Sequence, residues 1–273
     1  MEKIQLHEFR IPIKSVKKKV IYHFSDSHLT EYDEFSDISE KEKAISSSNA
    51  WEGVRKGFCD AYGEPYGELQ KQSPKTHFYN LLEAAKDGDA LIMAGDILDY
   101  VNGANIRLAK TALEDYAVPF IAVCGNHENA DDIPCGQPLE CMKNSIQILD
   151  LGDMVIIGLD DSKRSISREQ IEFLKEQIAS GRKILLVLHV PIMTDGNREL
   201  LLKSGVYFQL NFENCCEENL EFIELIRKNS ESFIAVLAGH LHYANESEIA
   251  PDLIQYVTAQ GITGNINKYI IGE

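Results

Sequence analysis

Six short apolar runs, each rich in β-branched residues, constrain the fold of this 273-residue chain more than any other feature. Continuous apolar runs of this length are typical of strands that are buried on both faces. Helical patterns separate most of the runs, and strands that alternate with helices favour an α/β domain. The runs comprise residues 20–24, 90–94, 120–123, 154–159, 184–188 and 233–238.

Four helical patterns lie among these runs, over residues 76–86, 105–116, 167–180 and 217–229. The pattern over 167–180 has the clearest start, because Ser167 and Gln170 form a capping-box pair. Shorter β patterns follow Gly239, so we expect mixed rather than purely parallel sheets.

A charged segment, residues 30–73, separates the first apolar run from the first regular helix. The single tryptophan, Trp51, is followed by Val54 and Phe58 at the spacing of one helix face. We therefore expect one domain over residues 1–273 with a helical insertion at about 30–73. Such an insertion is either structural padding or a cap over a functional site, and the sequence leaves both interpretations open.

Metal-capable polar side chains follow five of the six apolar runs. Because ligands bind beyond the carboxyl ends of strands in α/β sheets, the five clusters can converge on one place. Chance predicts only roughly 0.01–0.02 occurrences of G-H-x-H and ~0.03 of G-N-H in such a chain. In chain order the clusters are Asp26 and His28; Asp96 and Asp99; Asn126, His127 and Glu128; His189; and His240 and His242.

Aspartate, asparagine and histidine offer oxygen and imidazole nitrogen, which suit ions such as Mn, Fe or Zn and disfavour a structural zinc site built from cysteines. Even seven such donors are too many for one ion and suit two ions about 3.5–4 Å apart that share a carboxylate. Two such ions would leave a residual positive charge that attracts a phosphate ester, and would make hydroxide available as a nucleophile.

These residues, in this order, resemble the signature of the calcineurin-like metallophosphoesterase superfamily: D-x-H, G-D-x-x-D, G-N-H-E/D, a lone histidine, and G-H-x-H. The resemblance spans most of the chain and has no departure at an expected ligand. It implies a four-layer α/β/β/α sandwich with two mixed sheets. It also implies hydrolysis of phosphate esters at a dinuclear centre of two divalent transition-metal ions, with a metal-bridging hydroxide as the nucleophile.

The resemblance further implies a role for each motif residue. One ion would be held by Asp26, His28, Asp96 and His242, and the other by Asp96, Asn126, His189 and His240, with Asp96 as the bridge. His127 would face the substrate as a catalytic residue oriented by Asp99. A simpler role for Asp99, as the carboxylate that caps a helix, remains open. Glu128 has no assigned role.

We expect the substrate to be a small-molecule phosphodiester or phosphomonoester. The alternative, a nuclease of the same superfamily, is disfavoured by the net charge of −16 and by the lack of a basic tract. A non-catalytic interaction scaffold is less favoured still, since such scaffolds lose ligands and this chain has all seven.

No apolar run approaches the ~20 residues of a membrane span, so we expect no membrane association. The first residues carry no apolar core of a signal peptide, and the six cysteines show no C-x-x-C spacing. Both observations favour a cytoplasmic protein with reduced thiols.

Several residues near the motifs remain open between a role at the site and ordinary loop positions. They are the segment 160–162, Arg198 and Tyr207, together with the adjacent Cys215 and Cys216, which we expect to be inert.

Overall fold

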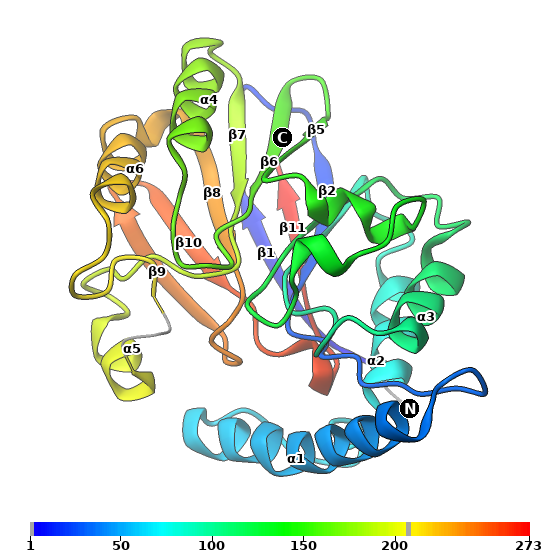
Figure 1. The fold of residues 1–273 in the computed structure, drawn as a ribbon. Coiled ribbons are helices and arrows are strands. Elements are labelled where there is room, and N and C mark those ends of the chain that lie inside the picture. Colours follow the sequence, from blue (N-terminus) through cyan, green and yellow to red (C-terminus); the bar gives the residue numbers. More distant parts are fainter. Residues whose placement is uncertain (1–2, 206–208) are drawn as a thin grey trace.

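The computed structural model describes residues 3–205 and 209–273, which form two mixed sheets (Figure 1). The first sheet has the order β1-β11-β2-β3-β4 and comprises β1 (Gln5–Ile11), β11 (Asn265–Ile271), β2 (Lys19–Phe24), β3 (Ala90–Ala94) and β4 (Phe120–Val123). The second has the order β5-β6-β7-β8-β10-β9 and comprises β5 (Ile146–Asp150), β6 (Met154–Leu159), β7 (Lys183–Val187), β8 (Phe233–Ala238), β10 (Leu253–Val257) and β9 (Asn245–Ala250).

Parallel pairing joins the strands that precede the polar clusters. β2, β3 and β4 are parallel neighbours in the first sheet, and β7 and β8 are parallel neighbours in the second. β11 lies between β1 and β2, parallel to β1 and antiparallel to β2. The expectation of mixed sheets is therefore confirmed.

Helices surround the two sheets, on their outer faces and at their lower end in Figure 1. They are α1 (Ile38–Tyr62), α2 (Pro74–Ala84), α3 (Gly103–Leu113), α4 (Arg168–Ala179), α5 (Arg198–Ser204) and α6 (Glu217–Lys228). Short 3₁₀ turns occupy Ala130–Asp132, Pro138–Lys143, Ser230–Ser232 and Gly261–Thr263. In Figure 1, α2 and α3 flank the first sheet, whereas α4 and α6 flank the second.

Three apolar cores define the layers of the fold. Alternate residues of β3 face opposite ways, so Leu91 and Met93 pack against α2 and α3, whereas Ile92 packs between the two sheets. A third core lies between the second sheet and helices α4 and α6, and includes Ile157 and Phe222. These cores confirm the four-layer α/β/β/α sandwich.

Local sequence signals set the helix boundaries. Ser167 caps α4 in the expected capping box with Gln170, and Ser73 caps α2, whose first residue is Pro74. The helical spacing around Trp51 belongs to α1, a 25-residue helix that runs across the lower end of the sheets in Figure 1.

None of the helices in the described part of the chain has the length and hydrophobicity of a membrane span.

Candidate metal centre

The five polar clusters converge at the carboxyl ends of their strands, as the sequence predicts. Asp26 follows β2, Asp96 follows β3, Asn126 follows β4, His189 follows β7 and His240 follows β8. Two groups of His and Asp side chains bring their ligand atoms within 4.8 Å of one another, and Asp96 belongs to both. A carboxylate shared in this way is what two neighbouring cations require.

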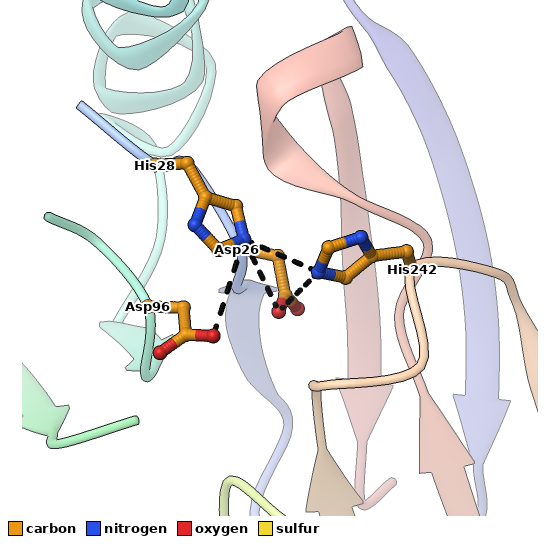
Figure 2. A group of neighbouring side chains, drawn as sticks. All are labelled: Asp26, His28, Asp96 and His242. Carbon is orange, nitrogen blue, oxygen red and sulfur yellow. Dashed lines mark hydrogen bonds and ion pairs between the residues drawn. The ribbon is translucent and has the colours of Figure 1, made fainter. Parts of the chain in front are cut away.

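Asp26, His28, Asp96 and His242 form the first group (Figure 2). His28 Nε2 lies 3.2 Å from His242 Nε2 and 3.9 Å from Asp96 Oδ2, and His242 Nε2 lies 3.2 Å from Asp26 Oδ1. Both carboxylates are buried, and a buried carboxylate is stable only when it is paired or bound to a metal. Burial lowers the pKa of His28, so its imidazole is neutral and can act as a ligand. This donor set fits a divalent transition-metal ion.

Asp96, His189 and His240 form the second group, and Asn126 lies beside it. His189 Nδ1 donates to the carbonyl of Ala94 at 2.8 Å, so Nε2 is the ring nitrogen that faces the other donors. That nitrogen lies 3.4 Å from Asp96 Oδ2 and 3.2 Å from Asn126 Oδ1. A fixed Nδ1 hydrogen bond is the usual way to orient a metal-binding histidine, so this set also fits a cation.

Five of the candidate ligands have left-handed backbone conformations. The φ angles are 55° at Asp26, 43° at His28, 52° at Asp96, 70° at His240 and 63° at His242. Such angles are uncommon outside glycine and cost energy. Strain at both members of the D-x-H and H-x-H pairs indicates that the fold holds these side chains in one orientation at a stability cost.

Two motif glycines allow the clusters to approach one another. A Cβ at Gly95 would lie 2.4 Å from His189 Nδ1, and a Cβ at Gly125 would lie 2.1 Å from Asp96 Oδ1. Since these distances are shorter than real Cβ contacts, any larger residue would displace a candidate ligand.

Asp99 and His127 form a pair next to the first group. His127 Nδ1 lies 2.9 Å from Asp99 Oδ1, as the resemblance implies. Asp99 also accepts hydrogen bonds from Trp51 Nε1 at 2.9 Å and from the Ser47 hydroxyl. Although burial raises the pKa of Asp99, these bonds and His28 hold it well below its usual range. Burial alone would lower the pKa of His127, but Asp99 and Asp96 raise it to about 9.

Asp99 caps none of the helices in the described residues. The residue that caps α3 is Asn102, whose side chain accepts a hydrogen bond from the Asn105 amide. The simpler interpretation of Asp99 is therefore wrong.

Glu128, for which the sequence suggests no role, holds the loops that carry the ligands. Its carboxylate accepts hydrogen bonds from the amides of Asp96, Leu98 and Gly125 at 3.0, 2.8 and 2.7 Å. Burial raises the pKa of Glu128 to about 7. The only signal in the sequence is its position directly after the G-N-H motif, which does not reveal these backbone partners.

Asp161 has a similar supporting role in the second sheet. It accepts hydrogen bonds from the amides of His189 and Val190 at 2.8 and 3.0 Å, and burial raises its pKa to about 7. Within the segment 160–162, Asp161 thus positions the candidate ligand His189. Ser162 of the same segment lines a cavity over the site, which is described below.

Helix α1 lies directly against the candidate ligands. The Trp51 ring stacks on His28 at 3.9 Å between centroids, and the Phe58 ring contacts His242 at 4.8 Å. Of the two interpretations of the segment 30–73, these contacts favour a cap over the site.

A cavity of about 330 Å³ opens over both groups. Arg164, on the loop between β6 and α4, contributes a cation that the sequence analysis did not identify, and its guanidinium lies over the Phe212 ring at 4.6 Å. The lining residues are Trp51, Val54, Phe58, Asp96, Asn126, His127, Ser162, Arg164, His240 and His242.

Of the remaining candidates, those in the described part of the chain do not line this cavity. Arg198 lies in a separate polar pocket with Asp195, Arg227 and Glu248. Tyr207 lies outside the described residues. Cys215 and Cys216 are free thiols near the start of α6.

Comparisons with known proteins agree with this geometry. A family model described as calcineurin-like phosphoesterase matches residues 19–244. A probable cyclic nucleotide phosphodiesterase from Fibrobacter succinogenes is 22% identical over 196 residues, which cover 69% of this chain and 64% of the relative. A probable glycerophosphodiester phosphodiesterase from Arcobacter nitrofigilis is 26% identical over 165 residues, which cover 56% of each chain. Each match thus spans less than two thirds of the curated relative's own length.

The fold is also similar to that of a solved structure. A dimetal phosphatase from Danio rerio superposes with a TM-score of 0.57 at 11% identity, and the match covers 93% of both chains. At this level of identity, the likeness concerns the fold alone.

Proposed function

This chain belongs to the calcineurin-like phosphoesterase family, and on that premise we propose that it hydrolyses phosphate esters of small molecules at a dinuclear metal centre. The observation that carries the proposal is the pair of buried donor groups that share Asp96 and lie under one cavity. Members of the family hydrolyse phosphoric esters, so the donor chemistry and the family agree.

We assign one ion to Asp26, His28, Asp96 and His242, and the other to Asp96, Asn126, His189 and His240. Support comes from the convergence of these donors, from the burial of the six His and Asp side chains and from the fixed Nδ1 bond of His189. Mn, Fe and Zn all suit such a set. When bound, the two ions would stabilise negative charge on the phosphoryl group and supply hydroxide near neutral pH.

His127 is the protein's own proton donor, and Asp99 orients it. Asp99 holds Nδ1 of His127, so Nε2 is the atom that can donate a proton to the leaving alkoxide of the substrate. His127 lines the cavity, whereas the Asp99 side chain is only 8% exposed. Asp99 is thus a positioning residue and His127 the catalytic one.

We favour a phosphodiester as the substrate, because both curated relatives described above are named as probable phosphodiesterases. A small ester suits a cavity of about 330 Å³. The net charge of −16 counts against the nuclease alternative, and the retention of every expected ligand counts against a scaffold without turnover. A cytoplasmic location is part of the proposal and is supported by six free cysteines.

The test combines metal analysis with a substrate panel. Protein loaded with Mn, Fe or Zn in turn should hold two ions per chain and hydrolyse methyl p-nitrophenyl phosphate. Asp96→Asn should lose at least one ion and most of the turnover, because a neutral amide is a poor bridge between two cations. Asp115→Asn, at an exposed position, is the matched control. Two bound ions and normal turnover in Asp96→Asn would contradict the assignment.

A further inference from the structure

The cavity over the candidate metal centre continues outward along α1 as an apolar groove. Val54 and Phe58 line both the cavity and a groove of about 440 Å³ that extends toward Tyr62 and Lys203. A substrate held by its phosphoryl group in the cavity can therefore place one ester arm in the groove. The cavity and the groove thus meet at Val54 and Phe58 of α1.

Small residues on α1 create the groove. Val54, Gly57 and Ala61 line it and recur at intervals of three and four residues, which places them on one face of the helix. A Cβ at Gly57 would meet no atom within 4 Å, and Val54 is 41% exposed. From residue 54 to 61 the helix advances about 10 Å, which matches an alkyl chain of about eight carbons.

The aromatic rings along the groove already stack on one another. The Tyr62 ring stacks on Tyr243 at 3.8 Å between centroids and on Phe58 at 6.1 Å. Lys203 Nζ lies 4.7 Å over the Tyr62 ring, and it donates to the carbonyl of Ala61 at 3.1 Å. These rings and this cation are thus engaged by the protein, which favours an aliphatic arm in the groove over a nucleobase.

We propose that the substrate is a phosphate ester with an unbranched aliphatic arm that lies in the groove of Val54, Gly57 and Ala61. This inference rests on the proposed function and adds the chemical class of one ester arm. The apolar arm loses contact with water against Val54 and Phe58, and this burial stabilises the bound substrate. A small polar arm such as glycerol would leave this wall uncovered.

Alkylphosphonates test the groove, because their carbon–phosphorus bond resists hydrolysis and each molecule has a single arm. Inhibition constants of methyl-, butyl- and octylphosphonate are measured on the metal-loaded protein against methyl p-nitrophenyl phosphate. Because the groove covers the alkyl chain on one side only, we expect inhibition to tighten about twofold per methylene, or about 100-fold from methyl- to octylphosphonate. Fluorescence of Trp51, the single tryptophan, gives a second readout of octylphosphonate binding without turnover.

Gly57→Met and Gly53→Met form a matched pair on α1. Both glycines have open space at their Cβ positions, but only Gly57 lines the groove. The new side chain of Gly57→Met should fill the groove and reduce the preference for octyl over methyl to less than tenfold. Gly53→Met should keep the preference of the wild-type protein.

Each result separates the inference from the function on which it rests. If the methyl diester is hydrolysed but inhibition does not depend on chain length, the inference fails and the proposed function stands. Equal octyl preference in both glycine variants would also overturn the inference. A nucleoside phosphonate that inhibits more strongly than octylphosphonate would replace the aliphatic arm with a base. If none of the metal-loaded forms hydrolyses any ester, the proposed function itself fails.

Discussion

Gly125→Ala should disturb the candidate metal centre without replacing a candidate ligand. The new methyl group would lie 2.1 Å from Asp96 Oδ1 and 2.4 Å from the Asp96 amide nitrogen, whereas ordinary contacts begin at 3.4 Å. The Asp96 carboxylate must therefore move by more than 1 Å. Ligand distances in metal sites lie within about 0.2 Å of their ideal values, so we expect roughly a 10- to 100-fold loss of affinity for metal. The overpacking itself should cost about 1–3 kcal/mol of stability.

The assay is titration of the metal-free protein with Mn²⁺, combined with thermal unfolding of the same sample. Gly53→Ala is the control, because its new methyl group meets no atom within 4 Å. Unfolding of the metal-free protein shows whether the variant folds, and the titration then reports the metal site alone. A folded Gly125→Ala protein that binds two ions with wild-type affinity would refute the proposed bridging role of Asp96.

Three further predictions follow from particular contacts. His127→Ala should retain both ions and lose turnover by roughly 10²–10⁴ on alkyl esters. The loss on nitrophenyl esters should be far smaller, because nitrophenolate leaves without being protonated. Equal losses on both kinds of ester would exclude proton donation. Trp51→Phe keeps a ring against His28 but removes the donor to Asp99, so kcat should fall by about three- to tenfold at unchanged metal content; a lower melting temperature at normal kcat would indicate packing alone. Burial and nearby Arg55 lower the pKa of His77 from 6.5 to about 4 in the folded protein. Between these pH values His77 is protonated in the unfolded chain but not in the folded one, so acid destabilises the fold. Between pH 7 and pH 5 His77 should lower the free energy of unfolding by about 2 kcal/mol, as measured by urea unfolding of the metal-free protein. His77→Gln should remove this part of the pH dependence.

The convergence of the candidate donors could be predicted from the sequence because their signals are local. Each donor follows a continuous apolar run, and parallel strands bring their carboxyl ends to one edge. The Asp99–His127 contact follows the family resemblance in the same way. Four main helices also have the expected positions, since capping residues such as Ser167 mark their boundaries within a few residues.

Other parts of the site could not be predicted, because they depend on contacts between distant segments. Glu128 and Asp161 act on backbone amides, and no side-chain pattern marks such partners. The contact of α1 with the candidate ligands cannot be predicted for the same reason: the spacing of Trp51 indicates a helix but not what the helix covers. The edge strands β1 and β5 have half-buried, mixed residues, so their apolar signal is weak.

The position of β11 between β1 and β2 determines when this protein can finish folding. Sheet pairing here joins the two ends of the chain, and His7 Nε2 contacts Asn265 Oδ1 at 3.0 Å across 258 residues. The turn before β11 also supplies hydrogen bonds to the backbone around Asp26, from Gly261 to Ser25 and from Ile262 to Asp26. During synthesis the Asp26 loop therefore lacks these partners until the last residues of this domain have left the ribosome. Contacts at such long sequence separation also form slowly, so tight metal loading should come after β11 has paired with β1 and β2.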